Sequence, residues 1–437
     1  MIPRALRKQT WNDHGATAGT IGTAFVLQGV LLISGVLVAR LLGIEGRGEL
    51  ALLVVFPLVL AQTGTLGIPI ATTYFIAQNP GATREIVRSI LGSLVLVTAA
   101  LIVVHAAILF VFLQGRHDAF IIAGLSTLLV LPARVAQMFG LALLQGQRLF
   151  GAFNLLRILQ VTFYSGSLVL IFLLGPRSLP LVVEAWAGSQ VLAALVTIWV
   201  AQRSVRNAAR GDGSSPSKGV LVRVGLKGLL GSANPVESFG IDDLIVGLVA
   251  GPAALGIYVV AFAFTNLPKF VAQSIGMVAY PRIAGLASGH RTAILRYSTL
   301  TLIVCGSIIL AGQALVGWLV PMFFGAEFNE AVGIARILLL SALPLCLRRV
   351  LAECARGAGL PGLGSLAEFI ACVVLVPSAI LLTASWGVTG SAWAMTISGC
   401  VSLLVVSIPL LSGVSNGKGQ VALSVGAARP ILSSKSG

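Results

Sequence analysis

Three carboxylates interrupt an otherwise apolar stretch in the second half of the chain. They are Glu237, Asp242 and Asp243, all within residues 221–250. A charged side chain at the middle of a bilayer costs about 2.5–3.5 kcal/mol on insertion scales, so such a residue usually pairs with another charge or performs a function. Here the carboxylates could couple an ion or tune a neighbouring cation. Adjacent residues of a helix point about 100° apart, so we expect at most one of Asp242 and Asp243 to face a central cavity.

A polar stripe follows in the next apolar stretch, residues 254–280. Asn266, Lys269 and Gln273 are spaced by three and four residues, so they share one face of a helix. Counted from the turn between the two stretches, Lys269 and Glu237 both lie on the order of 20 Å along their helices. Two interpretations follow. The two residues form a neutralising ion pair, or Lys269 faces a cavity while Glu237 tunes its charge or takes part in ion coupling.

The first half of the chain contains a matching deep cation. Arg134 and Gln137 are three residues apart within the apolar stretch 119–144, which contains no acid of its own. Arg134 therefore either faces an aqueous cavity or pairs inside its own helical bundle. Arginine offers a bidentate fork and lysine a point charge to phosphate oxygens. One deep cation from each half, Arg134 and Lys269, would suit a diphosphate substrate.

Other charged residues allow simpler explanations beside the functional ones. Arg336 is a further candidate for substrate binding, but it lies near the end of its apolar stretch and could pair with Glu327 or Glu330. Arg84 and Arg88 are suited to contacts with anionic lipid headgroups.

The composition determines what kind of element positions these residues. Of 437 residues, 57% are hydrophobic and only 10% are charged, whereas soluble chains have about 25% charged residues. Most of the chain must therefore have lipid as its solvent. The net charge of +15 is expected of cytoplasmic loops in a membrane protein, and we expect no nucleic-acid partner. The five cysteines are widely spaced and form no CxxC, so no disulfide framework, metal site or cofactor is predicted.

A span needs about 20 mainly apolar residues, and this rule predicts an all-α protein with twelve transmembrane helices. The only long hydrophilic stretch inside the chain, 202–219, is rich in Gly, Ser and basic residues and predicts a cytoplasmic linker. We therefore expect an N-terminal six-helix lobe (1–201), the linker, a C-terminal six-helix lobe (220–411) and a disordered cytoplasmic tail (412–437). The predicted spans are 17–39, 50–77, 89–113, 119–144, 153–174, 180–201, 221–250, 254–280, 294–320, 330–350, 363–383 and 387–411.

The distribution of basic residues predicts the orientation. With the N-terminus in the cytoplasm, 22 of the 29 Lys and Arg residues fall on the cytoplasmic side and four on the outer side. Because Lys and Arg are enriched in cytoplasmic loops, this bias favours both termini in the cytoplasm.

Paired glycines indicate an internal repeat. Two glycines five residues apart occur in two turns of each half, at offsets of 208 and 211. The pairs are Gly43 with Gly48, Gly251 with Gly256, Gly146 with Gly151, and Gly357 with Gly362. Six spans per half is an even number, so the halves would share one orientation and be related by an axis along the membrane normal. Tight turns need backbone conformations that glycine adopts cheaply, so we expect these glycines to shape hairpins without contacting substrate.

Several segments resemble the polysaccharide flippase branch of the multidrug/oligosaccharidyl-lipid/polysaccharide exporter (MOP) superfamily. They are VARLLGIEGRGELAL (38–52), ALLQGQRLFGAFNLLRILQ (142–160), AGPAALGIYVVAFAF (250–264), YPRIAGL (280–286), FFGAEFNEAVGIARILLL (323–340) and WGVTGSAWAM (386–395). The resemblance implies two six-helix lobes forming a V around a central cavity. It implies a transporter, not an enzyme, that flips a polyprenyl-diphosphate-linked oligosaccharide across the cytoplasmic membrane by alternating access.

The resemblance also implies the partners: the lipid-linked oligosaccharide, membrane lipids and polysaccharide assembly proteins. Two other functions stay open. A multidrug or cation antiporter of the same superfamily would use the acids of residues 221–250. A membrane glycosyltransferase or polymerase is disfavoured because no predicted outer loop exceeds about ten residues, too few to hold catalytic groups.

Overall fold

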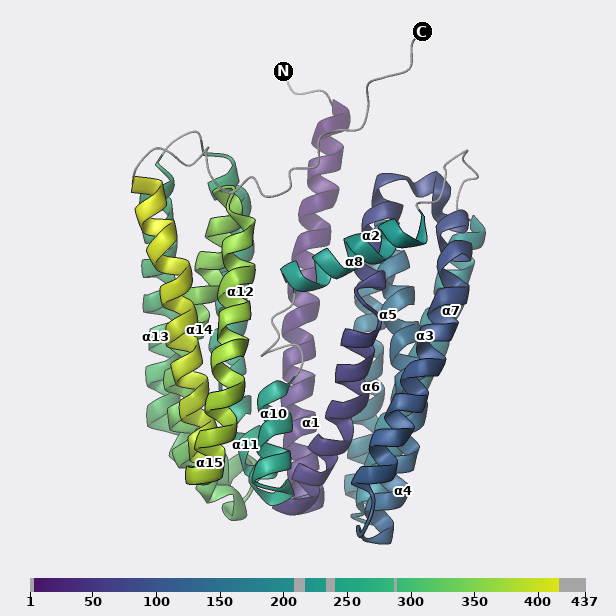
Figure 1. Cartoon of the computed structure of the whole chain (residues 1–437), viewed down its shortest axis with the longest axis vertical. Coiled ribbons are helices and arrows are strands. Elements are labelled where there is room, and N and C mark those ends of the chain that lie inside the picture. The colour runs from purple at the N-terminus through teal and green to yellow at the C-terminus, as the bar shows by residue number, and fades with distance from the viewer. Residues whose placement is uncertain (1–3, 208–216, 233–239, 287–288, 416–437) are drawn as a thin grey trace.

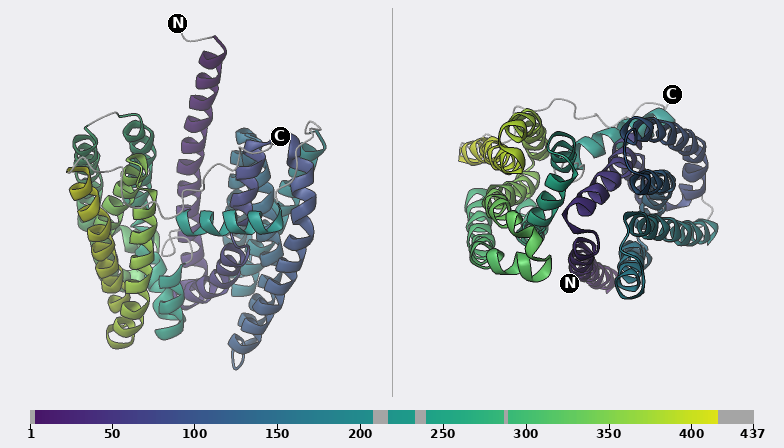
Figure 2. Two further views of the ribbon diagram at one scale, coloured as in Figure 1. Left: turned by 45° about the horizontal axis from the view of Figure 1, so that its top comes forward. Right: turned by 90° about the horizontal axis from the view of Figure 1, so that it is seen from below.

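The computed structural model describes residues 4–207, 217–232, 240–286 and 289–415, and these are helices joined by turns. Glu237, residues 208–216 of the predicted linker and residues 416–437 of the predicted tail lie outside the described residues. The described ends of these two segments are helical, since one helix runs to Asn207, another begins at Lys218 and the last runs to Ser415, so the predicted boundaries at 202, 219 and 412 are wrong. Figure 1 shows two groups of steep helices, α2–α7 and α12–α15, with α1, α10 and α11 between them. The groups lie apart at the end that carries both termini and converge at the opposite end, which gives the molecule a V shape (Figures 1 and 2).

The described helices divide between the two halves as follows. The first half contains α1 (Arg4–Gly64), α2 (Ile68–Gln78), α3 (Thr83–Phe112), α4 (Asp118–Ser126), α5 (Val130–Gly146), α6 (Phe150–Leu174) and α7 (Leu179–Asn207). The second half contains α8 (Lys218–Ser232), α10 (Ile241–Val249), α11 (Pro252–Ala263), α12 (Asn266–Ala284), α13 (His290–Phe323), α14 (Ala331–Gly357) and α15 (Pro361–Ser415). Short 3₁₀ turns are η1 (Pro80–Ala82), η2 (Thr127–Leu129) and η3 (Ala326–Glu330).

Within the described residues, eight helices are long and apolar enough to cross a membrane, or nine when the bent pair α11 and α12 is taken as one span. Two of the eight contain a break between two predicted spans: α1 at Gly43 (φ 69°) and α15 at Gly387 (φ 59°). The chain reverses direction at both breaks (Figure 1). Dividing α1 and α15 there, and counting the bent pair once, gives eleven of the twelve predicted spans of an all-α membrane protein; the twelfth is 221–250.

One predicted span, 221–250, is not a continuous helix. Its described parts are α8 and α10, and Gly240 before α10 is left-handed at φ 55°. Figures 1 and 2 show α8 lying across the axes of the other helices, against α2. There Gly225 meets Gly67 so closely that a Cβ on either would overlap the other's backbone. The proline at 235 removes a backbone hydrogen bond, which is the physical reason to expect an interruption in this span.

The two halves meet at the end opposite the termini, where α1 crosses α11. A Cβ on Gly48 would overlap the carbonyl of Pro252, and one on Gly256 would overlap the carbonyl of Ile44. Neither glycine has a positive φ. These two glycines lack a side chain because two helices touch backbone to backbone. The expectation that all eight paired glycines serve left-handed turn conformations is wrong, since only Gly43 and Gly251 have a positive φ. Gly43, the first glycine of its pair, does adopt the expected turn conformation.

The second pair of repeated turns has the same backbone hydrogen bonds in both halves. Three N–H groups, of Gln147, Arg148 and Leu149, bond back to Leu143, Gln145 and Leu144, and the same pattern recurs 211 residues later at Ala358, Gly359 and Leu360. The middle residue is left-handed both times, at φ 60° for Arg148 and φ 82° for Gly359. The repeat read from the sequence is thus present in the backbone.

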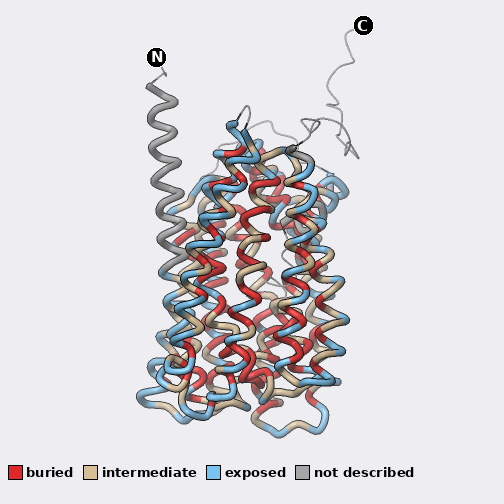
Figure 3. Tube along the Cα trace, turned by 90° about the vertical axis from the view of Figure 1, so that its left-hand side faces the viewer, coloured by how far each residue is buried: buried red, intermediate tan, exposed pale blue. Residues whose placement is uncertain are grey.

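Burial follows the helix packing. Figure 3 shows buried positions along the faces where helices meet and exposed positions on the outward faces. The exposed outward positions include large apolar side chains such as Leu96, Phe110 and Leu174. Apolar side chains that face outward are favourable only in lipid, so the surface agrees with a multi-pass membrane protein.

Candidate functional site: buried charges between the helices

Arg134 lies on α5, which packs against α2 and α7. Its side chain is half-buried, and its Nη1 donates a long hydrogen bond of 3.4 Å to Oε1 of Gln137. Gln137 is 2% exposed. Among the described residues, no carboxylate forms an ion pair with Arg134. The guanidinium therefore keeps donor capacity for an anionic group, which an ion pair would consume.

Lys269 has a different environment. It lies on α12, is 8% exposed, and places its Nζ 3.9 Å from the centroid of the Phe262 ring. The neighbouring acids that interact electrostatically with it are Asp242 and Asp243 of α10. Its predicted partner Glu237 lies outside the described residues. Lys269 is thus compensated by an aromatic face and two carboxylates.

The two adjacent acids of α10 have different partners. Asp242 is 2% exposed, and its Oδ2 accepts a 2.9 Å hydrogen bond from the hydroxyl of Tyr258 on α11. Asp243 interacts electrostatically with Arg47 of α1. Its Oδ1 is buried and has no hydrogen-bond partner among the described residues. The angle of about 100° between neighbouring positions allows Asp242 to bond to Tyr258 while Asp243 interacts with Arg47 of the first half as well as with Lys269.

Arg47 is a residue that the sequence did not single out. It lies beyond the break at Gly43, so α1 holds it against α10 at the junction of the halves. Tyr164 of α6 lies close to it as well. A glycine-flanked arginine between two apolar runs resembles a loop cation, and nothing local in the sequence indicates that the turn is buried by the other half.

Gln273 and Arg336 are both exposed. The guanidinium of Arg336 lies alongside Gly317 of α13, and its backbone carbonyl accepts a 2.8 Å hydrogen bond from the side chain of Gln313. In the described part of the chain, no ion pair joins Arg336 to Glu327 or Glu330. The structure therefore leaves Arg336 accessible from outside the helix bundle.

The sequence also did not indicate a buried ion pair between α14 and α15. Arg348 of α14 is 2% exposed and forms an ion pair with Glu368 of α15. The sequence placed Arg348 among the cytoplasmic loop cations, because it lies at the end of a predicted span. The repeat offset of 211 relates Arg348 to Gln137 of α5, the buried polar residue beside Arg134. That correspondence is the signal that could have identified it.

Polar contacts also join the halves at the end opposite the termini. Nε of Arg40 donates to the carbonyl of Phe323 at 2.6 Å, and its Nη2 donates to that of Met322 at 2.5 Å. These carbonyls belong to the C-terminal end of α13, where unsatisfied carbonyls attract a cation. Arg40 therefore bridges α1 of the first half and α13 of the second.

Comparison with known proteins identifies the family to which the chain belongs. The family described as polysaccharide biosynthesis protein matches residues 17–287, more than half of the chain. No curated protein sequence matches it.

The fold is similar to three solved structures, each under 20% identical in sequence. An inward-facing multidrug resistance MATE family transporter of the MOP superfamily has a TM-score of 0.66 at 18% identity, covering 90% of this chain and 96% of its own. The lipid II flippase MurJ in an inward closed conformation has a TM-score of 0.72 at 14% identity, covering 90% and 86%. A MOP superfamily transporter from Pyrococcus furiosus has a TM-score of 0.58 at 17% identity, covering 92% and 94%.

The matched folds are those of transporters and a flippase, not of enzymes, and the resemblance seen in the sequence is confirmed. The chain belongs to the polysaccharide biosynthesis protein family and has the transporter fold of the MOP superfamily.

Proposed function

We propose that this protein flips a polyprenyl-diphosphate-linked oligosaccharide across the cytoplasmic membrane by alternating access, for surface polysaccharide biosynthesis. The observation that carries the proposal is Arg134, a half-buried arginine on a transmembrane helix that no described carboxylate neutralises. A cation at that depth is costly unless it meets an anion. A diphosphate linkage supplies one, and the Gln137 amide beside Arg134 can share in the contact.

The remaining candidate residues receive secondary roles in this proposal. Gln273 and Arg336 are exposed and can guide the polar glycan part of the cargo. Lys269, with Asp242 and Asp243, sets the charge balance between the lobes and couples an ion to their movement, together with Glu237. In the proposed orientation both termini and the linker are cytoplasmic, so the lobes lie apart on the cytoplasmic side.

The alternative of a cation antiporter requires acids that are free to bind a cationic drug. The described acids nearest the lobe junction already interact with cations: Asp242 with Lys269, and Asp243 with both Lys269 and Arg47. A drug would have to displace protein cations that are fixed in the helices. The charge arrangement therefore favours an anionic cargo.

Reconstitution into vesicles tests the cargo class. Vesicles carrying a fluorescent polyprenyl-diphosphate oligosaccharide in both leaflets are treated with an externally added glycosidase, with and without the protein. Under the proposal, the protein makes the protected half of the oligosaccharide accessible, and it does not accumulate a cationic dye under a proton or sodium gradient. Gradient-driven accumulation of the dye, with the oligosaccharide still protected, would establish the antiporter instead.

A further inference from the structure

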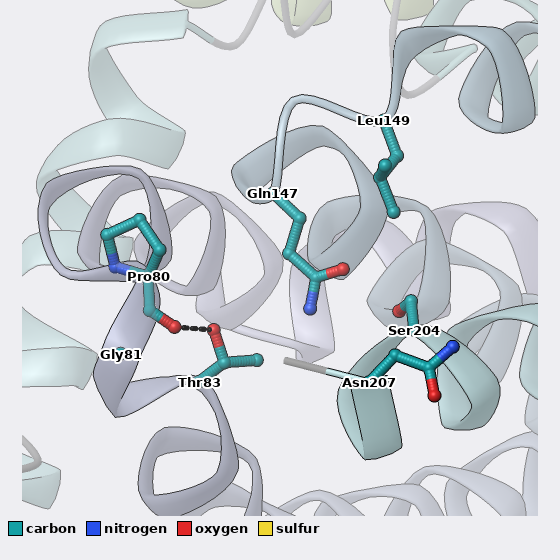
Figure 4. Close-up of a pocket in the computed structure, with 7 residues that line it drawn as sticks. All are labelled: Pro80, Gly81, Thr83, Gln147, Leu149, Ser204 and Asn207. Carbon is teal, nitrogen blue, oxygen red and sulfur yellow. Dashed lines mark hydrogen bonds between the residues drawn. The ribbon is translucent and has the colours of Figure 1, made fainter. Parts of the chain in front are cut away.

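A cavity with a mainly apolar lining and a few polar groups lies at the end of the first half that carries the termini (Figure 1). It has a volume of about 390 Å³ and is formed by three connections that are distant in the sequence. Pro80 and Thr83 come from the start of α3, Gln147 and Leu149 from the α5–α6 turn, and Ser204 and Asn207 from the end of α7. Figure 4 shows these side chains arranged around one opening. Its size is within the range of small-ligand sites, about 300–1,000 Å³.

The lining contains two side-chain amides, of Gln147 and Asn207, and two hydroxyls, of Thr83 and Ser204. Nε2 of Gln147 is buried and has no hydrogen-bond partner among the described residues. The hydroxyl of Thr83 donates to the carbonyl of Pro80, and that of Ser204 donates to the carbonyl of Ala201, both at 2.7 Å. Thr83 is fully buried, whereas Ser204 is partly exposed. Because the Ser204 hydroxyl donates its proton within α7, its oxygen can only accept a hydrogen bond from a ligand. A ligand hydroxyl, which both accepts and donates, satisfies this arrangement.

The internal repeat shows that the hairpin itself does not require this chemistry. The turn has the same backbone hydrogen bonds in both halves, yet Gln147 corresponds to Ala358 and Arg148 to Gly359. Arg148 adopts a left-handed conformation that glycine adopts without strain, at a cost of roughly 1–2 kcal/mol for a residue with a Cβ. The first half thus has an unpaired amide, of Gln147, and a strained backbone, at Arg148. The second half has the small residues Ala358 and Gly359 at the equivalent positions. Strain of this kind often marks a binding position.

The surroundings of the cavity indicate a lipid ligand. Trp199 of α7 is 60% exposed. The guanidinium of Arg203, the residue directly before Ser204, lies 5.7 Å from the centroid of the Trp199 ring. Exposed tryptophan with a stacked cation is typical of the membrane–water interface. Arg84 adds a further cation, with Nε donating to the carbonyl of Val205 at 3.1 Å. A ligand at the membrane–water interface contacts both basic side chains and the part of the acyl chains next to the headgroups.

We propose that this cavity binds the hydroxyl-bearing headgroup of an anionic phospholipid, of the phosphoglycerol type. The glycerol hydroxyls enter the cavity and bond to Gln147 Nε2 and to the oxygen of Ser204. The phosphate remains at the rim near the arginines. The same chemistry could come from soluble glycerol phosphate, but the interfacial position favours the lipid. This site is separate from the proposed Arg134 site, because neither Arg134 nor Gln137 lines the cavity.

Native mass spectrometry of the purified full-length chain tests the proposal with defined lipids. Phosphatidylglycerol is titrated in parallel with phosphatidylcholine, which has the same phosphate but no headgroup hydroxyl. The Gln147→Leu variant should bind phosphatidylglycerol about fivefold more weakly, the effect of one lost hydrogen bond. Gln145→Leu is the matched control, since Gln145 is exposed two residues away and does not line the cavity. It should bind both lipids as the unmodified chain does.

The other outcomes are equally informative. Equal binding of the two lipids, or equal phosphatidylglycerol binding by Gln147→Leu and Gln145→Leu, overturns the site. Competition by soluble glycerol 1-phosphate at the same concentration as the lipid overturns the lipid assignment. If Gln147→Leu does not fold, Ser204→Ala removes an acceptor from the same cavity and must weaken phosphatidylglycerol binding in its place.

Discussion

Arg348 and Glu368 form an ion pair between α14 and α15, and both side chains are largely buried. Two charges taken out of water are held only by each other, so removing one leaves the other without compensation. On the same helix, Arg356 pairs with Glu353 at 3.2 Å in a much more exposed position. The two pairs offer a direct comparison of a buried and an exposed ion pair within α14.

Arg348→Ala is expected to reduce the free energy of unfolding by about 3–5 kcal/mol, because it strands a buried carboxylate. The double variant Arg348→Met with Glu368→Leu should recover most of that loss, since it removes both charges. Arg356→Ala should change stability by less than about 1 kcal/mol. Thermal and denaturant unfolding of the purified proteins measures all three. Equal effects of Arg348→Ala and Arg356→Ala would contradict the buried pair.

Lys269 and Arg134 are expected to respond differently to neutralisation. Lys269→Met leaves Asp242 and Asp243 without their lysine, so we expect a loss of about 3–5 kcal/mol in stability. Adding Asp242→Asn should restore part of it, because one fewer buried charge remains. Unfolding of the single and double variants tests this coupling. A Lys269→Met protein that is as stable as the unmodified chain but no longer binds cargo would make Lys269 a cargo ligand instead.

At the scale of the helix, the junction of α1 and α11 depends on two glycines with no room for a Cβ. The hypothetical Cβ of Gly48 lies 2.9 Å from the backbone nitrogen of Gly256, and that of Gly256 lies 3.1 Å from the nitrogen of Gly48. The two glycines therefore have reciprocal surroundings, as expected for equivalent positions of a repeat around an axis between the halves.

Gly48→Ala should force α1 and α11 apart and lower the free energy of unfolding by about 1–3 kcal/mol. Gly35→Ala is the matched control in the same helix, because nothing lies within 4 Å of its Cβ position. That change should be neutral or stabilising, by up to about 1 kcal/mol, through helix propensity. The readout is the midpoint of thermal unfolding for both variants. Equal tolerance of the two substitutions would show that the helices are not in backbone contact.

The helices were easier to predict from the sequence than the contacts between them. Apolar stretches of span length gave the helices, and the glycine spacing gave the repeat, since both are local features of the sequence. The sequence did not show that Gly48 serves close packing, because the same residue type also makes turns. Pro235 indicated an interruption in 221–250, but the sequence could not show that α8 crosses the other helices, since α8 is positioned by its contact with α2 at Gly67.

The candidate site was predictable in part for the same reason. A charged residue inside an apolar stretch is visible in the sequence, so Arg134, Lys269 and Asp242 could be identified as candidates from the sequence. Their partners come from other helices and could not. Arg348 and Arg47 were missed because each lies near the end of a predicted span, where a basic residue is usually in the headgroup region.

For the whole molecule, the V shape places the closed contact between the halves at the end opposite the termini (Figures 1 and 2). Backbone packing of α1 on α11 and the hydrogen bonds of Arg40 to the end of α13 hold that contact. The proposed alternating access requires this contact to open. The two hydrogen bonds of Arg40 are the polar part that can be removed without altering the packing.

Arg40→Ala should shift the population towards separation of the halves at that end, because it removes two hydrogen bonds between them. Distances between spin labels placed on η3 and on the α3–α4 connection measure the shift in vesicles. Arg116→Ala is the control, as Arg116 stacks on Phe112 and Phe120 of its own half. An unchanged distance distribution in Arg40→Ala would show that packing alone closes this end.

The central claim is that Arg134 meets the diphosphate of a lipid-linked oligosaccharide during its passage across the membrane. The most direct test is the initial rate of oligosaccharide flipping in vesicles by Arg134→Gln, Arg134→Lys and the loop control Arg177→Gln. The account predicts that Arg134→Gln folds normally but flips at least about tenfold more slowly, the effect of losing one charge-assisted hydrogen bond. Arg134→Lys should be intermediate, and Arg177→Gln unchanged. Flipping by Arg134→Gln at the rate of the unmodified chain would contradict the account.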